Sequence, residues 1–314
     1  MAQGSPRKIR VPRVTIHGVL LLDKSAGQSS NDVLIKAKRL LNAQKAGHTG
    51  TLDPFATGLL PLCFGEATKF AQDLLDADKT YETVVHLGVA TTTGDTEGEV
   101  RATHAVDVTP EQIDSVLTQF RGEIGQVPPM YSALKRDGKP LYEYARAGVT
   151  LEREVRRVTI HALECLDYQT PYLRLRVSCS KGTYIRVLGE DIGTALGCGA
   201  HLKELRRTRV GSLSIANALT LDALAAAPDV VRAGLLAPVD ALLSSFPAVS
   251  LPPLLATRFL HGQRLALGKE SVQFPDSEGR VRVYRDDGGL LGTAQLLAYG
   301  VLAPERLIAT GTQG

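Results

Sequence analysis

The spacing of apolar residues predicts several short strands in the first part of the chain. Continuous apolar runs at residues 19–22 and 59–64 are typical of buried strands, and residues 81–87 alternate as a half-buried strand does. Residues 158–166 and 173–179 have the same character and lie close together, so we expect them to pair as neighbouring strands.

Segments with helical spacing separate these strands. Ser29 and the two polar residues after it can cap a helix that runs to about Leu41, because apolar residues then recur at intervals of three and four. Further helices are predicted at residues 67–75, 110–120 and 184–195. Strands and helices mix without a regular βαβ alternation, which predicts an α+β fold with a mixed, largely antiparallel sheet.

The composition of the chain changes near residue 248. Leu251-Pro252-Pro253 is typical of a linker, and residues 281–284 and 290–297 flank a polar turn, which predicts a hairpin. We therefore expect a small β-rich domain at residues 248–314.

The remainder divides into a basic N-terminal tail at residues 1–17 and a main domain at residues 18–245. Within the main domain, residues 124–157 are rich in proline, glycine and charge. Long segments of this kind are commonly functional, so we interpret residues 124–157 as an insertion.

Basic side chains concentrate in three places, although the formal net charge of the 314-residue chain is only +3. Residues 135–157 hold seven Lys or Arg against four Asp or Glu. The other two clusters are Lys203, Arg206, Arg207 and Arg209, and, near the N-terminus, Arg7, Lys8, Arg10 and Arg13. One such cluster is typical of a solvated face, but three in one chain fit contacts with nucleic-acid phosphates.

Nothing in the sequence predicts a metal or a cofactor. The four cysteines form no C-x-x-C pair, and no His/Cys cluster has zinc-ligand spacing. We expect reduced, mostly buried thiols and a cytoplasmic protein. We recognise no secretory signal and no membrane-spanning run, and we therefore expect no membrane partner.

The segment Gly47–Gly58, with the sequence GHTGTLDPFATG, is the strongest candidate for chemistry. It places one carboxylate, Asp53, among glycines, threonines and a proline. Pro54 biases Asp53 toward an extended backbone, and the glycines let the main chain bend tightly or approach a ligand. A carboxylate on such a loop suits a nucleophile or a general base, although a capped turn between two core elements has the same spacing.

This segment resembles the signature of the TruB family of tRNA pseudouridine synthases. Further blocks in the same order also resemble that family, from about Gly18 to Arg207: GVLLLDK from Gly18, PMYSALK from Pro129, CSKGTYIR from Cys179, and GCGAHL from Gly197 leading to Leu205-Arg206-Arg207. The resemblance implies the pseudouridine synthase fold, an RNA-binding role for the insertion and a PUA-like C-terminal domain.

The activity that the resemblance implies is the conversion of a uridine in the T loop of tRNA, position 55 by tRNA convention, to pseudouridine. The target base would first be flipped out of its stack. The reaction breaks a C–N glycosidic bond and rejoins the base through carbon, so no cofactor is expected. We expect a stand-alone monomer of the bacterial type that binds the T arm of tRNA.

Three residues match catalytic positions of the family. Asp53 matches the catalytic aspartate, and its role as attacker of the base, attacker of the sugar or remover of a sugar proton stays open. Arg186 matches the arginine partner, which would lower the pKa of that carboxyl and keep it ionised. Tyr81 matches the tyrosine that stacks on the target uracil and takes the proton from C5.

The resemblance also implies a substrate-binding set. Tyr184 and Leu205 resemble pocket walls, and His48 would fill the space that the flipped nucleotide leaves. Four lysines are expected to contact RNA phosphates, with positioning of the Asp53 loop as an alternative for the first two: Lys24, Lys69, Lys135 and Lys181. The chain departs from the family pattern at Ser25-Ala26, where a proline is common, and at Phe55, where a leucine is common.

Two other functions compete with this interpretation. One is a guide-RNA-dependent synthase of a ribonucleoprotein particle, against which the insertion speaks. The other is a tRNA-binding or tRNA-folding protein without essential chemistry, against which the intact set of Asp53, Tyr81 and Arg186 speaks. A P-loop enzyme is excluded, because the G-x-x-x-x-G-K-[ST] order is missing around Lys69.

Overall fold

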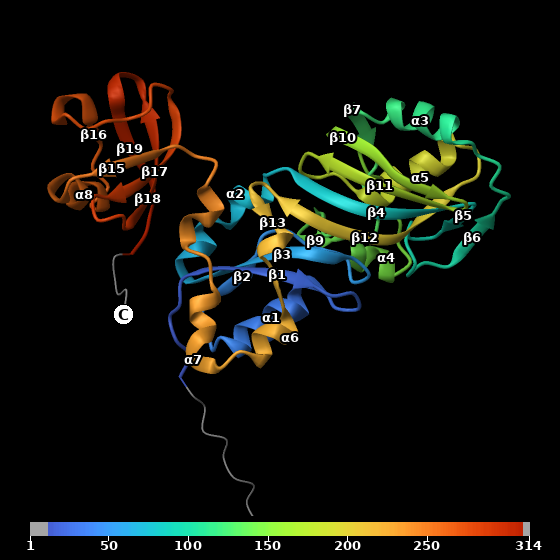
Figure 1. Cartoon of the computed structure of the whole chain (residues 1–314), viewed down its shortest axis with the longest axis horizontal. Helices are drawn as coiled ribbons and strands as arrows, with labels where there is room; N and C mark the ends of the chain where they lie inside the picture. Colours follow the sequence, from blue (N-terminus) through green and yellow to red (C-terminus); the bar gives the residue numbers. More distant parts are fainter. Residues whose placement is uncertain (1–11, 310–314) are drawn as a thin grey trace, which may run out of the picture.

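A ten-stranded sheet organises the main domain in the computed structural model, which describes residues 12–309 (Figure 1). Its strands are β1 (Gly18–Lys24), β2 (Ala46–His48), β3 (Thr57–Phe64), β4 (Lys79–Leu87), β7 (Gly122–Gln126), β10 (Arg156–Gln169), β11 (Tyr172–Cys179), β12 (Ala200–Val210), β13 (Leu213–Ser214) and β14 (Leu219–Thr220). Their order is β14-β1-β3-β12-β4-β11-β10-β7, with β2 beside β3 and β13 beside β12.

The pairing in this sheet is mixed and largely antiparallel, as the sequence predicted. Among the described pairings, β1–β14 and β3–β12 are parallel and the others are antiparallel. The predicted pairing of residues 158–166 with 173–179 is confirmed as β10 against β11. Along β4 every second residue is buried, which confirms the predicted half-buried strand and turns Tyr81 toward the core.

The helices predicted from Ser29 to about Leu41 and at residues 110–120 and 184–195 are confirmed, whereas three short helices at residues 141–146, 221–226 and 229–232 were not predicted. The helices of the main domain are α1 (Ser30–Leu40), α2 (Ala71–Leu75), α3 (Pro110–Gln119), α4 (Leu141–Arg146), α5 (Ile185–Ala195), α6 (Leu221–Ala226) and α7 (Asp229–Arg232), with short 3-10 turns η1 (Gly65–Phe70), η2 (Ile215–Asn217), η3 (Ala233–Leu235) and η4 (Val239–Leu243). Ser29 caps α1, because its hydroxyl accepts from the backbone N–H of Asp32 while the Asp32 carboxylate accepts from the N–H of Ser29. The single helix predicted at residues 67–75 is instead η1 followed by α2.

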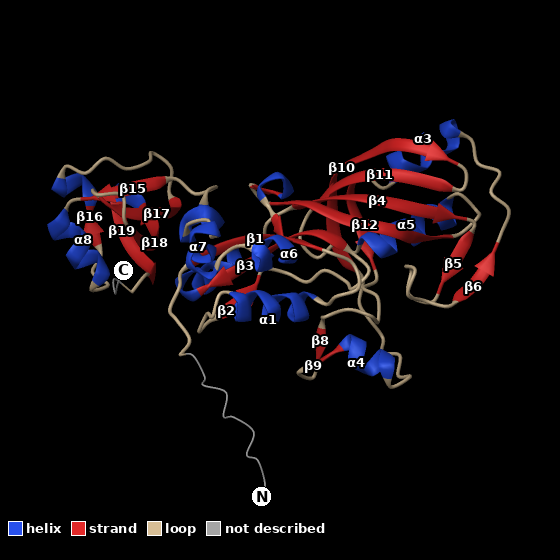
Figure 2. Ribbon diagram, turned by 60° about the horizontal axis from the view of Figure 1, so that its bottom comes forward, coloured by secondary structure: helices blue, strands red, loops and turns tan. Residues whose placement is uncertain are grey.

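The predicted insertion begins and ends inside the sheet. Gln126 on β7 pairs with Arg156 on β10, so the segment that leaves the sheet is residues 127–155. It carries the small hairpin of β8 (Lys135–Arg136) and β9 (Lys139–Pro140) followed by α4, which projects away from the sheet (Figure 2). A second small hairpin joins β5 (Val89–Thr91) to β6 (Val100–Thr103).

The C-terminal domain has its own sheet and core. Its elements are β15 (Ala248–Leu251), α8 (Pro253–Leu260), β16 (Leu265–Ala266), η5 (Leu267–Glu270), β17 (Gly279–Arg285), β18 (Leu290–Leu297), η6 (Ala298–Gly300) and β19 (Val301–Leu307), and the strand order is β15-β17-β18-β19-β16. The predicted hairpin is confirmed as β17 against β18.

The predicted linker at Leu251-Pro252-Pro253 is wrong. Leu251 is fully buried at the end of β15, and Pro253 opens α8. Proline favours the first helical position, because its missing N–H is not needed there. The same two prolines therefore mark a helix start within the C-terminal domain.

Polar contacts join the two domains. Arg280 of β17 pairs with Asp73 of α2, and the Nζ of Lys69 donates to the carbonyl oxygen of Leu307 at 2.9 Å. The hydroxyl of Tyr284 donates to Oδ2 of Asp240 at 2.6 Å. The C-terminal domain is therefore fastened at more than one point to the part of the main domain that holds α2 and η4.

The end of the expected N-terminal tail is docked on the main domain. Val14 forms an isolated bridge with Ala43, and Nδ1 of His17 accepts from the backbone N–H of Glu66 at 3.0 Å. Residues 12–17 are thus part of the fold. The basic residues Arg7, Lys8 and Arg10 lie outside the described residues.

Candidate active site

The loop that carries Asp53 connects β2 to β3 and is held on both sides of the carboxylate. Before it, the hydroxyl of Ser30 accepts from the N–H of Leu52 at 2.8 Å and donates to its carbonyl at 3.0 Å. After it, the Nζ of Lys24 donates to the carbonyl of Pro54 at 3.1 Å. A loop fixed in this way presents its carboxylate in one orientation.

Lys24 serves this loop through backbone contacts. Its ammonium also donates to the carbonyls of Ser25 and Gln28, at 3.0 and 2.8 Å, and the residue is 1% exposed. Burial lowers its pKa to about 8. These contacts favour the loop-positioning alternative over a contact with a phosphate. Two of these carbonyls, those of Ser25 and Gln28, belong to the loop in which Ser25-Ala26 stands where the family pattern has a proline.

Asp53 forms an ion pair with Arg186, which lies in the first turn of α5. The Nε of Arg186 is 2.9 Å from Oδ2 of Asp53. The arginine side chain is 4% exposed, whereas the aspartate side chain is 34% exposed. The pair therefore offers a carboxylate that a ligand can reach, held by a cation that a ligand cannot reach.

The pKa of Asp53 departs from the sequence expectation. Loss of solvent around the carboxyl raises its pKa, and the Arg186 guanidinium opposes that rise without cancelling it. Asp95 adds to the rise. Arg186 does favour the ionised form, as predicted, but the net direction of the pKa shift is upward because the partial loss of solvent around the carboxyl outweighs the effect of Arg186.

Asp95 is a second carboxylate in the site that sequence reasoning missed. It is 3% exposed, and its Oδ2 lies 3.5 Å from Nη1 of Arg186. Its Oδ1 accepts from the hydroxyl of Thr93 at 2.5 Å and from the N–H of Glu97 at 3.0 Å. The surrounding sequence, TTTGDTEGE, has the same Gly/Thr-rich composition as the Asp53 loop, which is the signal that could have found it.

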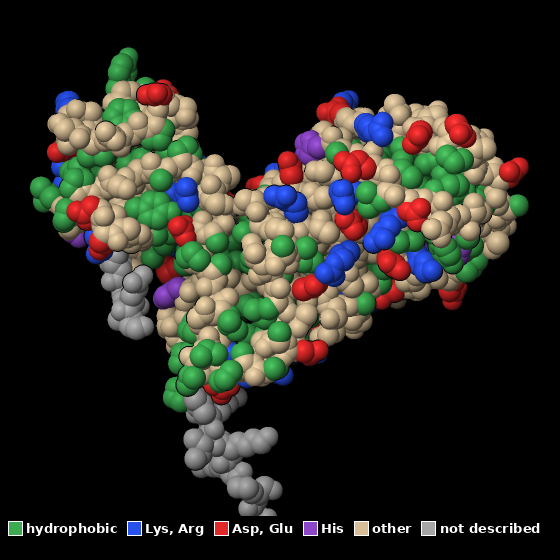
Figure 3. Space-filling view, in the orientation of Figure 1, with side chains coloured by type: hydrophobic (Ala, Val, Ile, Leu, Met, Phe, Trp, Pro, Cys, Tyr) green, Lys and Arg blue, Asp and Glu red, His purple; other side chains and the backbone are tan. Residues whose placement is uncertain are grey.

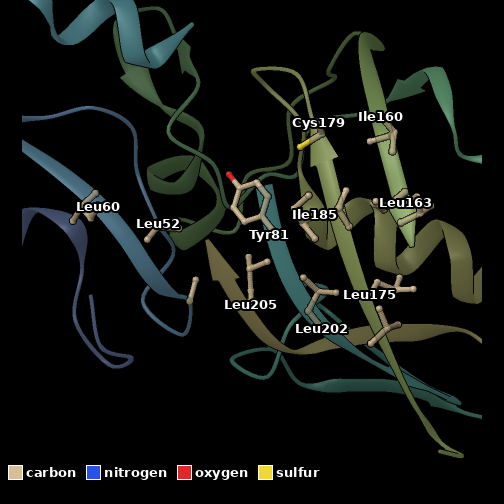
Figure 4. Packing of buried hydrophobic residues seen from close by; sticks show 14 of the residues in the cluster. Leu52, Leu60, Tyr81, Ile160, Leu163, Leu175, Cys179, Ile185, Leu202 and Leu205 are labelled. Atoms are coloured by element: carbon tan, nitrogen blue, oxygen red, sulfur yellow. The ribbon is translucent and has the colours of Figure 1, made fainter. Parts of the chain in front are cut away.

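Tyr81 lies on the buried face of β4 and packs with Leu205 of β12 (Figure 4). The two residues are 9% and 7% exposed. Burial raises the pKa of the Tyr81 hydroxyl, and the guanidinium of Arg207 opposes this. The structure thus brings the predicted tyrosine and the predicted apolar wall together on one face of the sheet, alongside Leu52 of the Asp53 loop.

Tyr184 marks the junction of the insertion with the site. It immediately precedes α5, and the side-chain amide of Gln126 binds its backbone twice, accepting from the N–H at 3.0 Å and donating to the carbonyl at 3.2 Å. The carbonyl of Tyr131, in the insertion, accepts from Nη2 of Arg186 at 2.7 Å. The insertion therefore touches the catalytic arginine candidate directly.

His48 is the last residue of β2 and lies at the start of the Asp53 loop. Its Nδ1 is buried and has no hydrogen-bond partner among the described residues. Burial lowers its pKa, and the nearby Arg207 guanidinium acts in the same direction. A neutral imidazole suits the expected role as a space-filling group.

The other three predicted lysines lie in different surroundings. Lys69 pairs with Glu66 at 2.6 Å and binds the C-terminal domain through Leu307. Lys181 is exposed and pairs with Asp76 at 2.9 Å. Lys135 is exposed on the insertion hairpin. Of the four, Lys135 and Lys181 therefore present their charge at the surface.

The basic cluster at residues 203–209 is divided by the alternation of β12. Arg206 pairs with Asp23 at 2.6 Å, and the ammonium of Lys203 lies 3.9 Å from the ring centroid of Tyr172. Arg207 is 2% exposed. Figure 3 shows blue and red side chains interspersed over the region of β4, β11 and β12. The cluster is thus no continuous basic surface.

Within residues 12–309, no helix is long and apolar enough to cross a bilayer. The same range holds no group of His, Cys, Asp or Glu side chains arranged to bind a metal ion.

Comparison with known proteins gives family matches along most of the chain. The family described as "TruB family pseudouridylate synthase (N terminal domain)" matches residues 38–185. "tRNA pseudouridylate synthase B C-terminal domain" matches residues 186–244, and "Pseudouridine synthase II TruB, C-terminal" matches residues 247–308.

Individual relatives are similar over their full lengths. A protein of Burkholderia mallei (strain ATCC 23344) named tRNA pseudouridine synthase B is 63% identical over 313 residues, which cover 99% of this chain and 100% of that protein. A protein of the same name from Ralstonia pickettii (strain 12J) is 62% identical over 314 residues, which cover 96% of this chain and 98% of that protein.

Solved structures share the fold. The structure described as "Structure of H/ACA RNP bound to a substrate RNA containing 2'-deoxyuridine" matches with a TM-score of 0.71 at 26% identity, over 92% of this chain and 84% of that chain. "Crystal Structure of a Cbf5-Nop10-Gar1 Complex" matches with the same TM-score and coverage at 28% identity.

Proposed function

The chain belongs to the TruB family and is a tRNA pseudouridine synthase that isomerises uridine in tRNA to pseudouridine, and on this premise we propose that it converts the T-loop uridine at position 55 with Asp53 as the catalytic carboxylate. The observation that carries the proposal is the ion pair of Asp53 with Arg186 at 2.9 Å. It combines a carboxylate open to a ligand with a cation fixed beneath it.

The reaction requires a change of bond at the base and no change of oxidation state. The bond from C1′ to N1 breaks, a bond from C1′ to C5 forms, the proton on C5 leaves, and N1 gains a proton. A carboxylate can stabilise or trap the separated fragments, as carboxylates do in glycosidases. In the first two routes open to it Asp53 bonds to the base or to the sugar, and in the third it acts as a base that removes a sugar proton.

The buried position of Tyr81 supports base flipping. A uracil can reach its ring only after leaving the RNA stack, since Tyr81 and Leu205 lie beneath the surface. Stacking of a base on an aromatic ring contributes about 1–3 kcal/mol, which is of the size needed to offset unstacking. We assign Tyr81, Tyr184 and Leu205 to the pocket, and His48 to the space that the flipped nucleotide vacates.

Two observations favour a stand-alone enzyme over a guide-RNA-dependent one. The identity to a protein named tRNA pseudouridine synthase B is 63%, against 26% to the chain of the H/ACA RNP structure. The insertion, with its exposed hairpin at Lys135–Arg136, offers the enzyme its own RNA contact. That the enzyme acts as a cytoplasmic monomer stays a prediction from the sequence.

The experiment that tests the proposal uses the purified chain and an unmodified tRNA transcript with no other RNA. Chemical mapping of pseudouridine should give one product, at position 55, and Asp53→Asn should give none. Product at another position would contradict the site assignment. Binding without product would instead favour the tRNA-folding function, and product only after addition of a guide RNA would favour the ribonucleoprotein function.

A further inference from the structure

Arg207 is a buried arginine at the centre of the main domain. It lies on β12 directly opposite Tyr81 of β4 and opposite Gly58 of β3. The neighbouring backbone leaves no freedom here: Gly58 has a φ of +103°, and a Cβ at that position would lie 2.3 Å from the Arg207 carbonyl oxygen. Three adjacent strands therefore fix the backbone from which the Arg207 side chain extends.

The guanidinium of Arg207 is incompletely bonded. Its Nε donates to the carbonyl of Leu59 at 2.8 Å, and its Nη1 makes a long contact of 3.5 Å with the carbonyl of Thr51. Its Nη2 is buried and has no hydrogen-bond partner among the described residues. An unpaired donor on a buried cation costs free energy, so this arrangement calls for a hydrogen-bond acceptor close to Nη2.

No carboxylate within residues 12–309 pairs with this guanidinium, in contrast to Arg186, which has Asp53 and Asp95. The Arg207 guanidinium also lowers the pKa of His48, Lys24 and Lys79, and none of these three groups is anionic. The remaining group is the Tyr81 hydroxyl, which can accept a hydrogen bond and can carry a negative charge.

Three titratable groups influence the pKa of the Tyr81 hydroxyl, and they act in different directions. Cys179 of β11 and Asp53 of the loop add to the burial that raises its pKa. Arg207 of β12 opposes them and is the main group that does so. The arginine is thus placed to make a negative charge on the hydroxyl oxygen less unfavourable.

We propose that Arg207 is the positioning residue for Tyr81: its free Nη2 directs an N–H toward the hydroxyl oxygen, orients that oxygen toward the base and stabilises its phenolate form. The inference rests on the proposed role of Tyr81 in taking the C5 proton. In that step the phenolate oxygen binds the proton, the electron pair of the C5–H bond restores the ring double bond, and the resulting phenol later returns a proton to water. Arg207 acts through Tyr81 and does not touch the substrate.

The first test measures ionisation of Tyr81 without any RNA. The full chain is labelled with ¹³Cζ-tyrosine, and the Tyr81 signal is assigned by its loss in Tyr81→Phe. Arg207→Met should shift the titration of that signal to higher pH, and Arg207→Lys, which keeps the charge, should shift it less. Arg206→Met is the matched control, because Arg206 lies next in sequence but pairs with Asp23 on the other side of the strand. An unchanged Tyr81 titration in Arg207→Met, or an equal shift in Arg206→Met, overturns the proposal.

The second test is a double-mutant cycle on the single-turnover rate with saturating enzyme. Arg207→Met should slow the reaction about 10- to 100-fold at neutral pH, in line with the effect of one nearby charge on a titrating group. In the Tyr81→Phe background the same change should cause little further loss, because the hydroxyl it serves is gone. If the rate losses from Arg207→Met and Tyr81→Phe multiply in the double variant, Arg207 supports the fold and does not act through the Tyr81 hydroxyl.

Thermal unfolding of each variant identifies those that fold, and Arg207→Gln, which also removes the charge but keeps a polar side chain, carries both tests if Arg207→Met does not fold. The two proposals fail in different ways. If Tyr81→Phe turns over at the wild-type rate, the role of Tyr81 is wrong, whereas the titration still reports whether Arg207 controls its ionisation. If Tyr81→Phe is slow and the titration does not move, the role of Arg207 alone is wrong.

Discussion

The Arg186 guanidinium joins Asp53 to the insertion at residues 127–155: its Nε lies 2.9 Å from Oδ2 of Asp53, and its Nη2 donates to the carbonyl of Tyr131 at 2.7 Å. Its Nη1 donates to the carbonyl of Thr93 at 3.0 Å and lies 3.5 Å from Oδ2 of Asp95, so all three guanidinium nitrogens are held. Since the insertion is proposed to contact RNA, one buried side chain connects the proposed RNA contact to the proposed catalytic carboxylate of Asp53.

Asp53→Asn should remove product formation and leave tRNA binding within about a factor of a few. Asparagine keeps the shape of the side chain but removes the charge that the reaction needs. The measurement is pseudouridine yield under single-turnover conditions, with affinity determined in parallel. Asp76→Asn, which changes an exposed aspartate paired with Lys181, is the control and should react normally. Turnover of Asp53→Asn above a few per cent of the wild-type rate would refute the assignment.

Arg186→Met should move the acid limb of the pH–rate profile to higher pH. The surroundings of Asp53 raise its pKa and Arg186 opposes them, so removal of the cation raises that pKa further. The reactive form is the carboxylate, and protonation on the acid side then sets in earlier as the pH falls. Arg186→Lys should shift the limb less, because it keeps the charge. If the acid limb of Arg186→Met lies at the same pH as that of the wild type, Arg186 does not control the pKa of Asp53.

Tyr81→Phe and Tyr81→Leu should separate stacking from proton transfer. Phenylalanine keeps the ring and loses the hydroxyl, so we expect near-normal affinity and a single-turnover rate lower by about 100-fold or more. Leucine loses both, and affinity should also fall by the stacking contribution of about 1–3 kcal/mol. Half-saturation and saturated rate measured for each variant check the split. Near-wild-type rates in both variants would show that Tyr81 serves only as part of the hydrophobic core.

Lys135→Ala and Arg136→Ala should each weaken the salt dependence of tRNA binding. Both side chains are exposed on the insertion hairpin, and each released phosphate contact lowers the slope of log affinity against log salt by about 0.7–0.9. Arg176→Ala is the control, since Arg176 is paired with Glu82 and Glu164 on the open face of the sheet. Slopes that stay equal in all three variants would place the RNA contact elsewhere.

A chain ending at Pro247 should fold and keep its saturated rate on a T-arm minihelix, but it should need more substrate to reach half-saturation. The C-terminal domain has its own core and holds none of the assigned catalytic residues. Removal does break the contacts of Arg280 with Asp73 and of Lys69 with Leu307, so the melting temperature should fall somewhat. A large drop in saturated rate with unchanged half-saturation would show that this domain supports the active site.

Local patterns predicted most elements, because each carried its own signal. The capping residue Ser29 fixed the start of α1, and the alternation along β4 placed Tyr81 toward the core. Leu251-Pro252-Pro253 misled, since two prolines begin a helix as readily as they stiffen a linker.

Sequence reasoning predicted the residues of the site only where they belong to a recognised motif. Asp95 is distant from Arg186 in the sequence, and only the fold brings the two side chains together. The segment around Asp95 has no recognised catalytic motif. Arg206 and Arg207 look equivalent in the sequence, yet one lies near the surface and the other is buried, which depends on the strand they occupy and on its irregular pairing beyond Arg207. Lys24 looks like a surface charge, but backbone carbonyls from two loops surround its ammonium.

The pairing of Gln126 with Arg156 makes residues 127–155 the loop of a β-hairpin. Lengthening such a loop costs little free energy, because closure entropy grows only with the logarithm of loop length. Residues can therefore be gained or lost there while the sheet register, and with it the place of Tyr81, stays unchanged. Changes in the length of this loop alone can then alter the substrate range of the enzyme, while the residues assigned to catalysis stay the same.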